Sequence, residues 1–242
     1  MIELVDVYKK FGSKTVLDGV TTKLEEGKTT VLIGPSGCGK STILRIILRL
    51  IEADSGEIIV DGEDLLKYSP SKMDLFRTRI GMVFQSAALF DSLTIWENVG
   101  FALLERENLK PEKVREIASE KLKIVGLEGS EDLYPSELSG GMQKRAAIAR
   151  AIAHDPDIIF YDEPTTGLDP ITSTLIENLI KELQVKTKKT SIIVTHQHST
   201  IFRTSDIITM FYKGKVYFTG TPDEIKNTND ELIRNFIEGR VS

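Results

Sequence analysis

The chain of 242 residues is 40% hydrophobic and 28% charged, proportions that suit one well-packed globular domain. It carries 31 Lys and Arg against 36 Asp and Glu, a net charge of -5. This balance lacks the basic excess typical of duplex DNA binders, so we expect no nucleic-acid partner. No stretch approaches the ~18 apolar residues of a membrane helix, so any membrane pathway belongs to another chain. We see no secretory signal, and the single Cys38 excludes an intrachain disulfide and fits a reducing compartment.

The first part of the chain shows short apolar segments leading into a Gly-rich turn. Their patterns predict strands at 2–8, 16–24, 29–33 and 57–61, and a helix from Lys40 to about Leu50. The strand at 29–33 runs directly into the turn, and the helix follows it. This strand–turn–helix order is typical of an α/β fold with a mainly parallel sheet.

The middle of the chain has a different character, because no convincing strand appears between about Thr94 and Ala153. Thr94 is a suitable cap for a helix over 95–106. A second helix is indicated by an apolar face made of Val114, Ile117, Ala118, Leu122 and Val125. We therefore predict that residues 86–150 form a mostly helical lobe inserted in a single domain over 1–242.

The α/β pattern then resumes. Asp169 and Pro170 supply an N-cap and a first-turn proline for a helix. That helix is predicted to carry Ile171, Leu175, Ile176, Leu179 and Leu183 inward. Strands are predicted at 158–161, 191–195, 207–212 and 216–218, and a helical tail at about 223–238.

The segment from Gly34 to Ser41 matches the P-loop pattern G-x-x-x-x-G-K-[ST] between a strand and a helix. The glycines let backbone N–H groups turn inward around phosphate oxygens at a helix N-terminus. Lys40 should reach the β- and γ-phosphates and Ser41 should bind Mg²⁺, whereas Cys38 occupies a variable position with a backbone role. The predicted nucleotide contacts are Gly34, Pro35, Ser36, Gly37, Cys38, Gly39, Lys40, Ser41 and Thr42. A P-loop alone leaves kinases, GTPases, helicases and other ATPases open.

The run Leu138-Ser139-Gly140-Gly141-Met142-Gln143 narrows the choice. Ser139 can cap a helix that begins at Gly140, and the glycines expose N–H groups at its positive end, which makes a second anion site. An ordinary capped helix would show the same local pattern. The run resembles the LSGGQ signature of ABC ATPases, with Met142 where Gln is commoner. This resemblance implies that Leu138, Ser139, Gly140, Gly141 and Met142 face ATP bound by a partner subunit.

The apolar run Ile158–Tyr161 ends in Asp162 and Glu163, which resembles the Walker B segment of the same family. The resemblance implies that Asp162 holds Mg²⁺, mostly through water, and that Glu163 acts as the general base toward the attacking water.

Shorter elements extend the resemblance to ABC ATPases. Gln85 matches the Q-loop, which implies contact with Mg²⁺ and water, and His196 matches the switch histidine beside the γ-phosphate. Gly167, Leu168 and Asp169 match the D-loop, in which Leu168 and Asp169 contact the opposite subunit. Phe11 is the expected ring that stacks on adenine, with Tyr8 as the alternative, and His154 and His198 match no role and are expected to be surface or capping residues.

The resemblance covers essentially the whole chain and implies the ABC ATPase fold. That fold has a P-loop NTPase core with a mainly parallel sheet, an N-terminal antiparallel β subdomain and an inserted α-helical lobe. It implies an ATPase that uses ATP and Mg²⁺, with Lys40, Gln85, Glu163 and His196 in catalysis. It also implies a homodimer on ATP binding, coupled to an integral-membrane permease at the cytoplasmic, inner face of the cell membrane.

The stretch from Gln85 to Val99 is similar to the Mla/Mce-type lipid-transport ATPases, as are the runs 135–142 and 169–172. This resemblance implies phospholipid transport across the cell envelope, with a permease and a lipid-binding MCE-type protein as partners. The apolar run 87–90 either docks the permease or belongs to the core of the lobe. Two alternatives remain open: an importer ATPase for amino acids or another small polar solute, and a non-transport ABC ATPase that acts on DNA or ribosomes.

Overall fold

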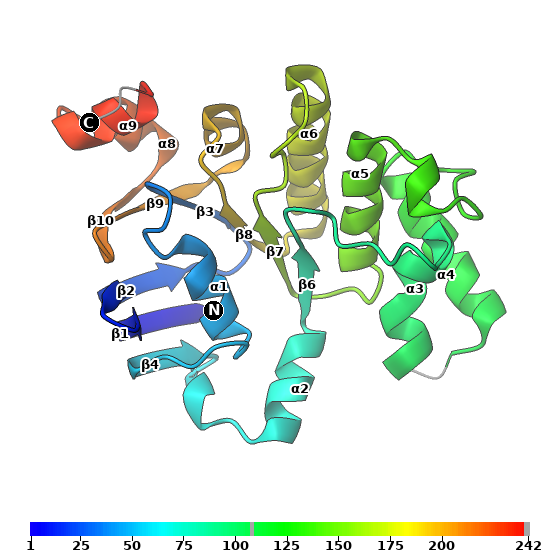
Figure 1. The fold of residues 1–242 in the computed structure, drawn as a ribbon, viewed down its shortest axis with the longest axis horizontal. Helices are drawn as coiled ribbons and strands as arrows, with labels where there is room; N and C mark the ends of the chain where they lie inside the picture. Colours follow the sequence, from blue (N-terminus) through cyan, green and yellow to red (C-terminus); the bar gives the residue numbers. More distant parts are fainter. Residues whose placement is uncertain (107–108, 240–242) are drawn as a thin grey trace. The chain divides into compact units, whose positions relative to one another are not determined.

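The computed structural model describes residues 1–106 and 109–239, which form two compact units (Figure 1). The first unit combines Met1–Arg77 with the chain from Thr190 onward, and the second unit is Thr78–Lys189. No helix within the described ranges has the length and the apolar content needed to cross a bilayer.

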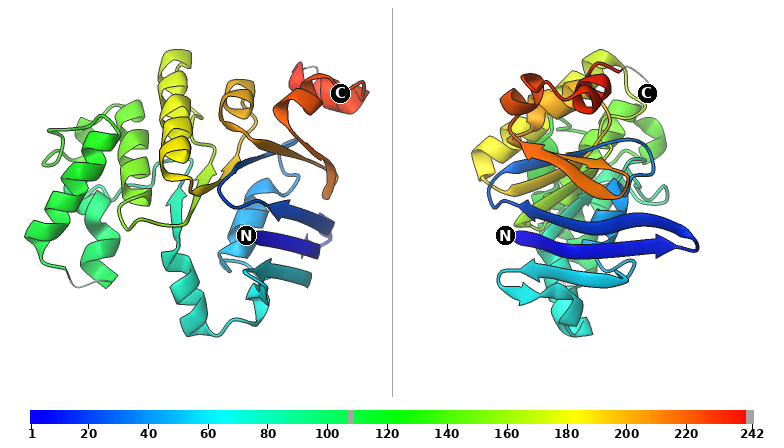
Figure 2. Two further views of the ribbon diagram at one scale, coloured as in Figure 1. Left: turned by 180° about the vertical axis from the view of Figure 1, so that it is seen from behind. Right: turned by 90° about the vertical axis from the view of Figure 1, so that its left-hand side faces the viewer.

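The first unit contains an antiparallel sheet with the strand order β2-β1-β4-β5 (Figure 2). Its strands are β1 (Ile2–Phe11), β2 (Lys14–Leu24), β4 (Ser55–Val60) and β5 (Glu63–Asp64). The predicted strands of this region are confirmed, although β1 is longer than predicted because its end still pairs with Lys14. A 3-10 turn, η1 (Leu65–Lys67), and helix α2 (Pro70–Thr78) follow, and the sequence patterns did not predict them.

The first unit also holds a mostly parallel group of strands around β3 (Thr29–Ile33). β3 pairs in parallel with β8 (Thr190–Val194) and with β9 (Ile207–Tyr212), and β10 (Lys215–Gly220) pairs antiparallel to β9. Every residue of β3 and β8 is buried, and each strand ends in three consecutive apolar residues, as expected for strands covered on both faces.

Short helices follow these strands in the first unit. They are α1 (Lys40–Ile47), α7 (His198–Thr204), α8 (Pro222–Lys226) and α9 (Glu231–Ile237). Helix α1 ends earlier than predicted, and Arg49 just beyond it has the left-handed φ of 49°. The predicted single tail helix is two helices, because Thr221 and Asp230 each cap a new helix start.

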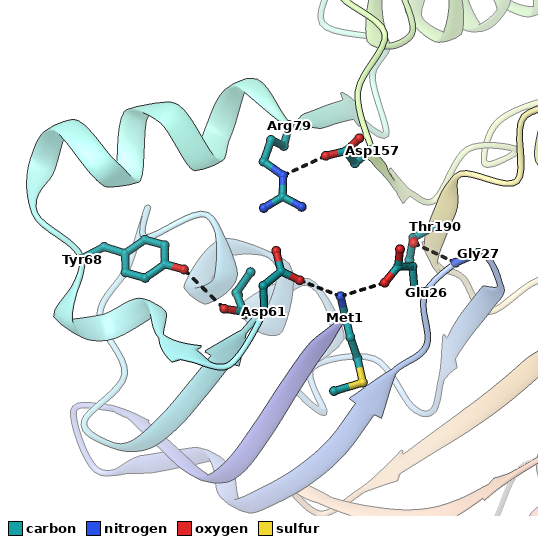
Figure 3. Close-up of polar contacts among 9 residues, drawn as sticks. Met1, Glu26, Gly27, Asp61, Tyr68, Arg79, Asp157 and Thr190 are labelled. Carbon is teal, nitrogen blue, oxygen red and sulfur yellow. Dashed lines mark hydrogen bonds and ion pairs between the residues drawn. The ribbon is translucent and has the colours of Figure 1, made fainter.

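Polar contacts tie together the strand ends of the first unit (Figure 3). The main-chain nitrogen of Met1 lies 3.1 Å from Asp61 Oδ1 and 3.6 Å from Glu26 Oε2. Gly27 N–H donates to Thr190 Oγ1 at 3.0 Å, which joins the turn before β3 to the first residue of β8. These contacts join the N-terminal ends of β3 and β8, and the P-loop and His196 follow the opposite, C-terminal ends of the same strands.

The second unit pairs β6 (Ile80–Val83) in parallel with β7 (Ile158–Asp162). Between them the described chain forms α3 (Ile95–Arg106), α4 (Pro111–Ile124), a 3-10 turn η2 (Pro135–Glu137) and α5 (Gly140–Ala151), and it contains no strand. Helices α3, α4 and α5 pack on one another (Figure 1), and α6 (Pro170–Thr187) follows β7. The predicted helices of this region are confirmed, including α3 with the bounds that the sequence predicted.

The prediction for the buried face of α6 is partly wrong. Ile176 and Leu183 are buried as expected and Leu179 is half-buried, but Ile171 is 77% exposed and Leu175 is 58% exposed. The buried face also includes Ile180 and three polar residues: Ser173, Glu177 and Gln184. The helix therefore turns part of its apolar surface outward.

Candidate functional site

The P-loop lies between β3 and α1, in a backbone conformation that requires glycine. Gly34 has a φ of 140°, and a Cβ there would lie 2.2 Å from the carbonyl oxygen of Phe211 on β9. Gly39 has a φ of 106°, and its Cβ would lie 2.5 Å from Leu17 Cδ2 on β2. Both positions favour glycine because a side chain would meet neighbouring atoms as well as backbone strain. The loop is therefore a tightly packed cradle that opens at the N-terminus of a helix.

Lys40 is buried against this loop. Its Nζ donates to the carbonyl oxygens of Gly34 at 2.7 Å and Pro35 at 3.0 Å, and it lies 3.7 Å from Cys38 Sγ. A phosphate oxygen accepts a stronger, charge-assisted hydrogen bond than a carbonyl does. The ammonium can therefore exchange these carbonyls for a phosphate. The Cys38 thiol is buried beside the lysine.

A cavity of about 730 Å³ in the first unit has Pro35 of the P-loop and His196 among its lining residues. His196 is exposed and lies two residues after the end of β8. The volume is in the range of small-molecule sites, and the structure thus places the predicted switch histidine and the P-loop on one cavity. His198 also lines this cavity, and its Nε2 lies 3.1 Å from the Phe236 carbonyl oxygen. His198 is therefore half-buried and contacts α9, and it is not simply a surface residue.

The two candidate adenine-stacking rings are both near the end of β1. Phe11 is 50% exposed, with Lys9 Nζ 5.4 Å from its ring centroid, and Tyr8 is 38% exposed. The hydroxyl of Tyr8 covers Gly19, where a Cβ would lie 2.8 Å away. Phe11 therefore offers the more accessible ring.

The signature segment of the second unit begins α5. Ser139 is the N-cap, and its hydroxyl accepts a hydrogen bond from Met142 N–H at 3.3 Å. Ser139 and Gly140 are exposed, so this helix N-terminus faces solvent as an anion site requires. Gly141 is packed instead, because a Cβ there would lie 2.4 Å from Thr172 Cγ2.

The D-loop residues lie beside the signature segment. Asp169 caps α6 by accepting from Ile171 N–H and Thr172 N–H, each at 3.0 Å. Hydrogen bonds from the Thr172 hydroxyl and from these amides lower the pKa of Asp169. Leu168 Cδ2 lies 3.7 Å from the position of a Cβ on Gly140. The signature and the D-loop are thus packed together within the second unit.

Asp162 and Glu163 follow one another at the end of β7. Glu163 has the left-handed φ of 50°, and its Oε2 accepts a hydrogen bond from Thr166 Oγ1 at 3.1 Å. The described ranges contain no group of three or more His, Cys, Asp or Glu able to hold a metal. The predicted donors Ser41, Gln85 and Asp162 are all oxygen donors, which is the chemistry that Mg²⁺ prefers.

Two cations on α5, which the sequence patterns did not reveal as site residues, contact the Q-loop. Lys144 Nζ donates to the main-chain carbonyl oxygen of Gln85 and lies 3.5 Å from the main-chain carbonyl oxygen of Glu163. Gln85 itself is exposed. Arg150 donates to the carbonyl oxygens of Ala87 at 2.7 Å and Ala88 at 2.6 Å. The sequence feature that could have indicated this role is the position of Lys144 two residues before the small apolar run 146–149. A charged residue on a buried helix face usually has a partner.

The apolar run 87–90 has a buried part, as expected for the core of the lobe, and an exposed part, as expected for a docking surface. Ala87 is buried, whereas Phe90 is 44% exposed and lies with its ring centroid 4.6 Å from that of Phe101. Phe84, just before Gln85, is exposed as well. The Q-loop therefore presents aromatic surface around a buried anchor.

A glycine cradle at a helix N-terminus, a second exposed helix N-terminus, and an Asp-Glu pair at a strand end define a P-loop ATPase of the α/β class. The family model described as ABC transporter matches residues 17–166. The chloroplastic protein TRIGALACTOSYLDIACYLGLYCEROL 3 of Arabidopsis thaliana is 42% identical over 100% of this chain and 74% of its own length. The intermembrane phospholipid transport system ATP-binding protein MlaF of Haemophilus influenzae is 39% identical over 99% of this chain and 90% of its own length.

Solved structures agree with this assignment. A dimeric ATP-binding cassette in a post-hydrolysis state, bound to ADP and Pi, has a TM-score of 0.82 and 35% identity over 91% of this chain and 98% of its own. The cbiO1 protein of Clostridium perfringens, part of an ABC transporter complex, has a TM-score of 0.84 and 28% identity, covering 99% of this chain and 98% of its own. The chain therefore belongs to the ABC transporter family, as an ATP-binding and ATP-hydrolysing subunit. The predicted family, fold class and ATPase activity are confirmed.

Proposed function

We propose that this ATPase powers a separate membrane permease that moves phospholipid across the cell envelope. One observation carries the proposal: the similarity to MlaF, a protein named for intermembrane phospholipid transport, extends over 99% of this chain. A second candidate rests on a protein of Mycobacterium leprae named as a probable ribonucleotide transport ATP-binding protein, which is 38% identical over 99% of this chain and 69% of its own length.

In the proposed site, the P-loop amides and Lys40 bind the phosphates of ATP, and Phe11 stacks on adenine. Ser41, Gln85 and Asp162 would hold Mg²⁺, which neutralises phosphate charge when it is bound. Glu163 takes the proton of the attacking water, and the hydrogen bond from Thr166 fixes one of its oxygens. His196 donates to the γ-phosphate from the side of the cavity that it shares with Pro35.

We further propose one ABC ATPase domain over 1–242 that forms a homodimer on ATP binding. Each ATP would lie between the P-loop of one copy and the signature segment, Leu138 to Met142, of the other. The dimeric state of the similar cassette and the solvent-facing N-terminus of α5 support this arrangement. The exposed Ile171 and Leu175, directly after the D-loop, also suit a surface that a second copy covers.

The permease would dock at the aromatic surface of Phe84 and Phe90 beside the Q-loop. We propose that the docked chain lies on the cytoplasmic, inner face of the membrane, and that a lipid-binding MCE-type protein completes the assembly. Phe90→Ser should abolish co-purification of the permease from solubilised membranes and leave ATP binding intact. Tyr134→Ser is the matched control, because Tyr134 is 46% exposed in the same unit. Equal retention of the permease by both variants would exclude this docking surface.

The decisive experiment for the substrate uses the complex that co-purifies with the tagged chain, reconstituted in vesicles. We expect ATP-driven transfer of a fluorescent phospholipid to acceptor vesicles, and no transfer with Glu163→Gln. ATP-driven uptake of a radiolabelled ribonucleotide, without lipid transfer, would overturn the phospholipid proposal. The isolated Glu163→Gln chain should elute as a dimer in ATP, with turnover lowered by orders of magnitude; unchanged hydrolysis would remove Glu163 from its role.

A further inference from the structure

Helix α5 carries a buried lysine whose ammonium connects two segments of the predicted catalytic machinery. Lys144 is only 5% exposed. Its Nζ donates to the carbonyl oxygen of Gln85 in the Q-loop and lies 3.5 Å from the carbonyl oxygen of Glu163. All three residues belong to the second unit, and Lys144 lies on the helix that the signature segment begins.

The burial of this lysine costs free energy, and its hydrogen bonds must offset that cost. An ammonium carries three donors, and its removal from water costs free energy that only good acceptors offset. The main-chain carbonyls of Gln85 and Glu163 are such acceptors, and each gains a charged donor.

The backbone that these bonds hold is in a conformation that needs external support. Glu163 has a φ of 50°, and Ala87 and Ala88 in the Q-loop have φ values of 62° and 50°. Residues other than glycine keep left-handed conformations when the surroundings fix them. Lys144 contacts the first of these segments, and Arg150, two turns further along α5, donates to both alanine carbonyls.

We propose that Lys144 is a positioning residue that fixes the main chain of Glu163 and Gln85 relative to the signature helix. A shift of α5 then displaces the carboxylate that activates water and the Q-loop side chain together. The inference rests on the proposed roles of Glu163 and Gln85, and it adds a physical link from the signature helix to both of them.

The test compares Lys144→Met with Arg145→Met in the full chain. Methionine keeps the length of the lysine side chain without its donors. Arg145 is the neighbouring cation on the same helix, and its Nη1 donates to the carbonyl oxygens of Val125 at 3.2 Å and Gly126 at 2.8 Å, at the end of α4. Both changes remove a cation with two carbonyl partners, but only one of them touches Glu163.

We expect Lys144→Met to lower kcat of ATP hydrolysis by about 10- to 100-fold, the effect of a small misplacement of a catalytic group. The affinity for a fluorescent ATP analogue should stay within about twofold, since the predicted nucleotide contacts lie in the P-loop and at Phe11. Arg145→Met should keep its kcat and lose only thermal stability. If Lys144→Met does not fold by circular dichroism, Lys144→Leu, which is shorter and likewise has no donor, takes its place with the same expected loss of kcat.

A merely structural role is excluded by a double-mutant cycle. In the Glu163→Gln background, Lys144→Met should change the residual rate by a much smaller factor than in the unmodified chain, because the part of its effect that passes through the Glu163 carboxylate is already lost. The same large factor in both backgrounds, or equal kcat for Lys144→Met and Arg145→Met, overturns the proposal. A Glu163→Gln chain that hydrolyses ATP normally would instead refute the proposed role of Glu163, and the two failures are therefore distinguishable.

Discussion

The contact between the signature segment and α6 allows a quantitative test with a single methyl group. A Cβ added at Gly141 would lie 2.4 Å from Thr172 Cγ2, whereas a Cβ at the adjacent Gly140 would have only an ordinary contact, 3.7 Å from Leu168 Cδ2. Thr172 cannot easily rotate away, because its hydroxyl and its N–H both bond to Asp169. Gly141→Ala should therefore destabilise the protein, while Gly140→Ala should not.

The expected size follows from two opposing effects. Overpacking at so short a distance costs about 2–3 kcal/mol. Alanine regains about 1 kcal/mol through its higher helix propensity, which leaves a net loss of about 1–2 kcal/mol. For a chain of this length each kcal/mol shifts Tm by about 2–4 °C, so Gly141→Ala should melt about 2–8 °C below the unmodified protein. Thermal denaturation followed by circular dichroism measures this, and Gly140→Ala should melt at or above the original temperature.

A rescue variant makes the explanation refutable. Thr172→Ser keeps the hydroxyl that bonds to Asp169 and removes the methyl group that clashes. The double variant Gly141→Ala/Thr172→Ser should therefore recover most of the lost Tm. If the double variant melts as low as Gly141→Ala, or if both glycine variants lose the same stability, the packing argument fails.

Three further predictions concern the nucleotide site and the antiparallel sheet. Thr166→Val removes the hydrogen bond to the catalytic carboxylate, and steady-state ATPase assays should show about tenfold lower kcat, as a charge-assisted bond of about 1.5 kcal/mol implies; an unchanged kcat refutes this. Phe11→Ala should weaken binding of a fluorescent ATP analogue at least about fivefold, from stacking worth about 1 kcal/mol or more, and a larger effect of Tyr8→Ala would reverse the assignment. Hydrogen bonds from the Lys9 side chain and the next main-chain N–H lower the pKa of Asp54 below 3.8, so its stabilisation is present above that pH and is lost as the pH falls through the lowered pKa. Asp54→Asn should therefore lower Tm at neutral pH, with the difference vanishing in acid; a constant difference would contradict the linkage.

The sequence predicted those parts of the fold and the candidate site that depend on local chemistry. Glycines at 34 and 39 mark the P-loop, and the structure shows why each position excludes a side chain. Ser139 and Asp169 were predicted as caps because their hydrogen bonds reach only two or three residues along the chain. Strand β3 was predicted with its observed bounds, because a strand buried on both faces is rich in β-branched and apolar residues, as the run from Thr29 to Ile33 is.

The two cations on α5 could not be predicted with their partners. Lys144 and Arg150 donate to carbonyl oxygens 19 to 63 residues away along the chain, and any residue type supplies a carbonyl. The sequence therefore carries no mark of the accepting side of these bonds. The left-handed φ values at Ala87, Ala88 and Glu163 could not be predicted from the sequence either, since these residue types usually avoid that conformation.

Helix α6 shows why the buried face of a helix is not determined by its apolar residues alone. At 100° per residue, Ile176, Ile180 and Leu183 cluster on one side, while Ile171 lies roughly opposite and Leu175 about a right angle away. A periodic pattern can thus contain two apolar faces, and only tertiary packing decides which one faces the core. Here the buried face includes Ser173, Glu177 and Gln184, whereas Ile171 and Leu175 in the first two turns are exposed to solvent. Burial of apolar side chains of this size is favourable. The exposed Ile171 and Leu175, which were predicted to face the core, therefore favour a partner surface beside the D-loop.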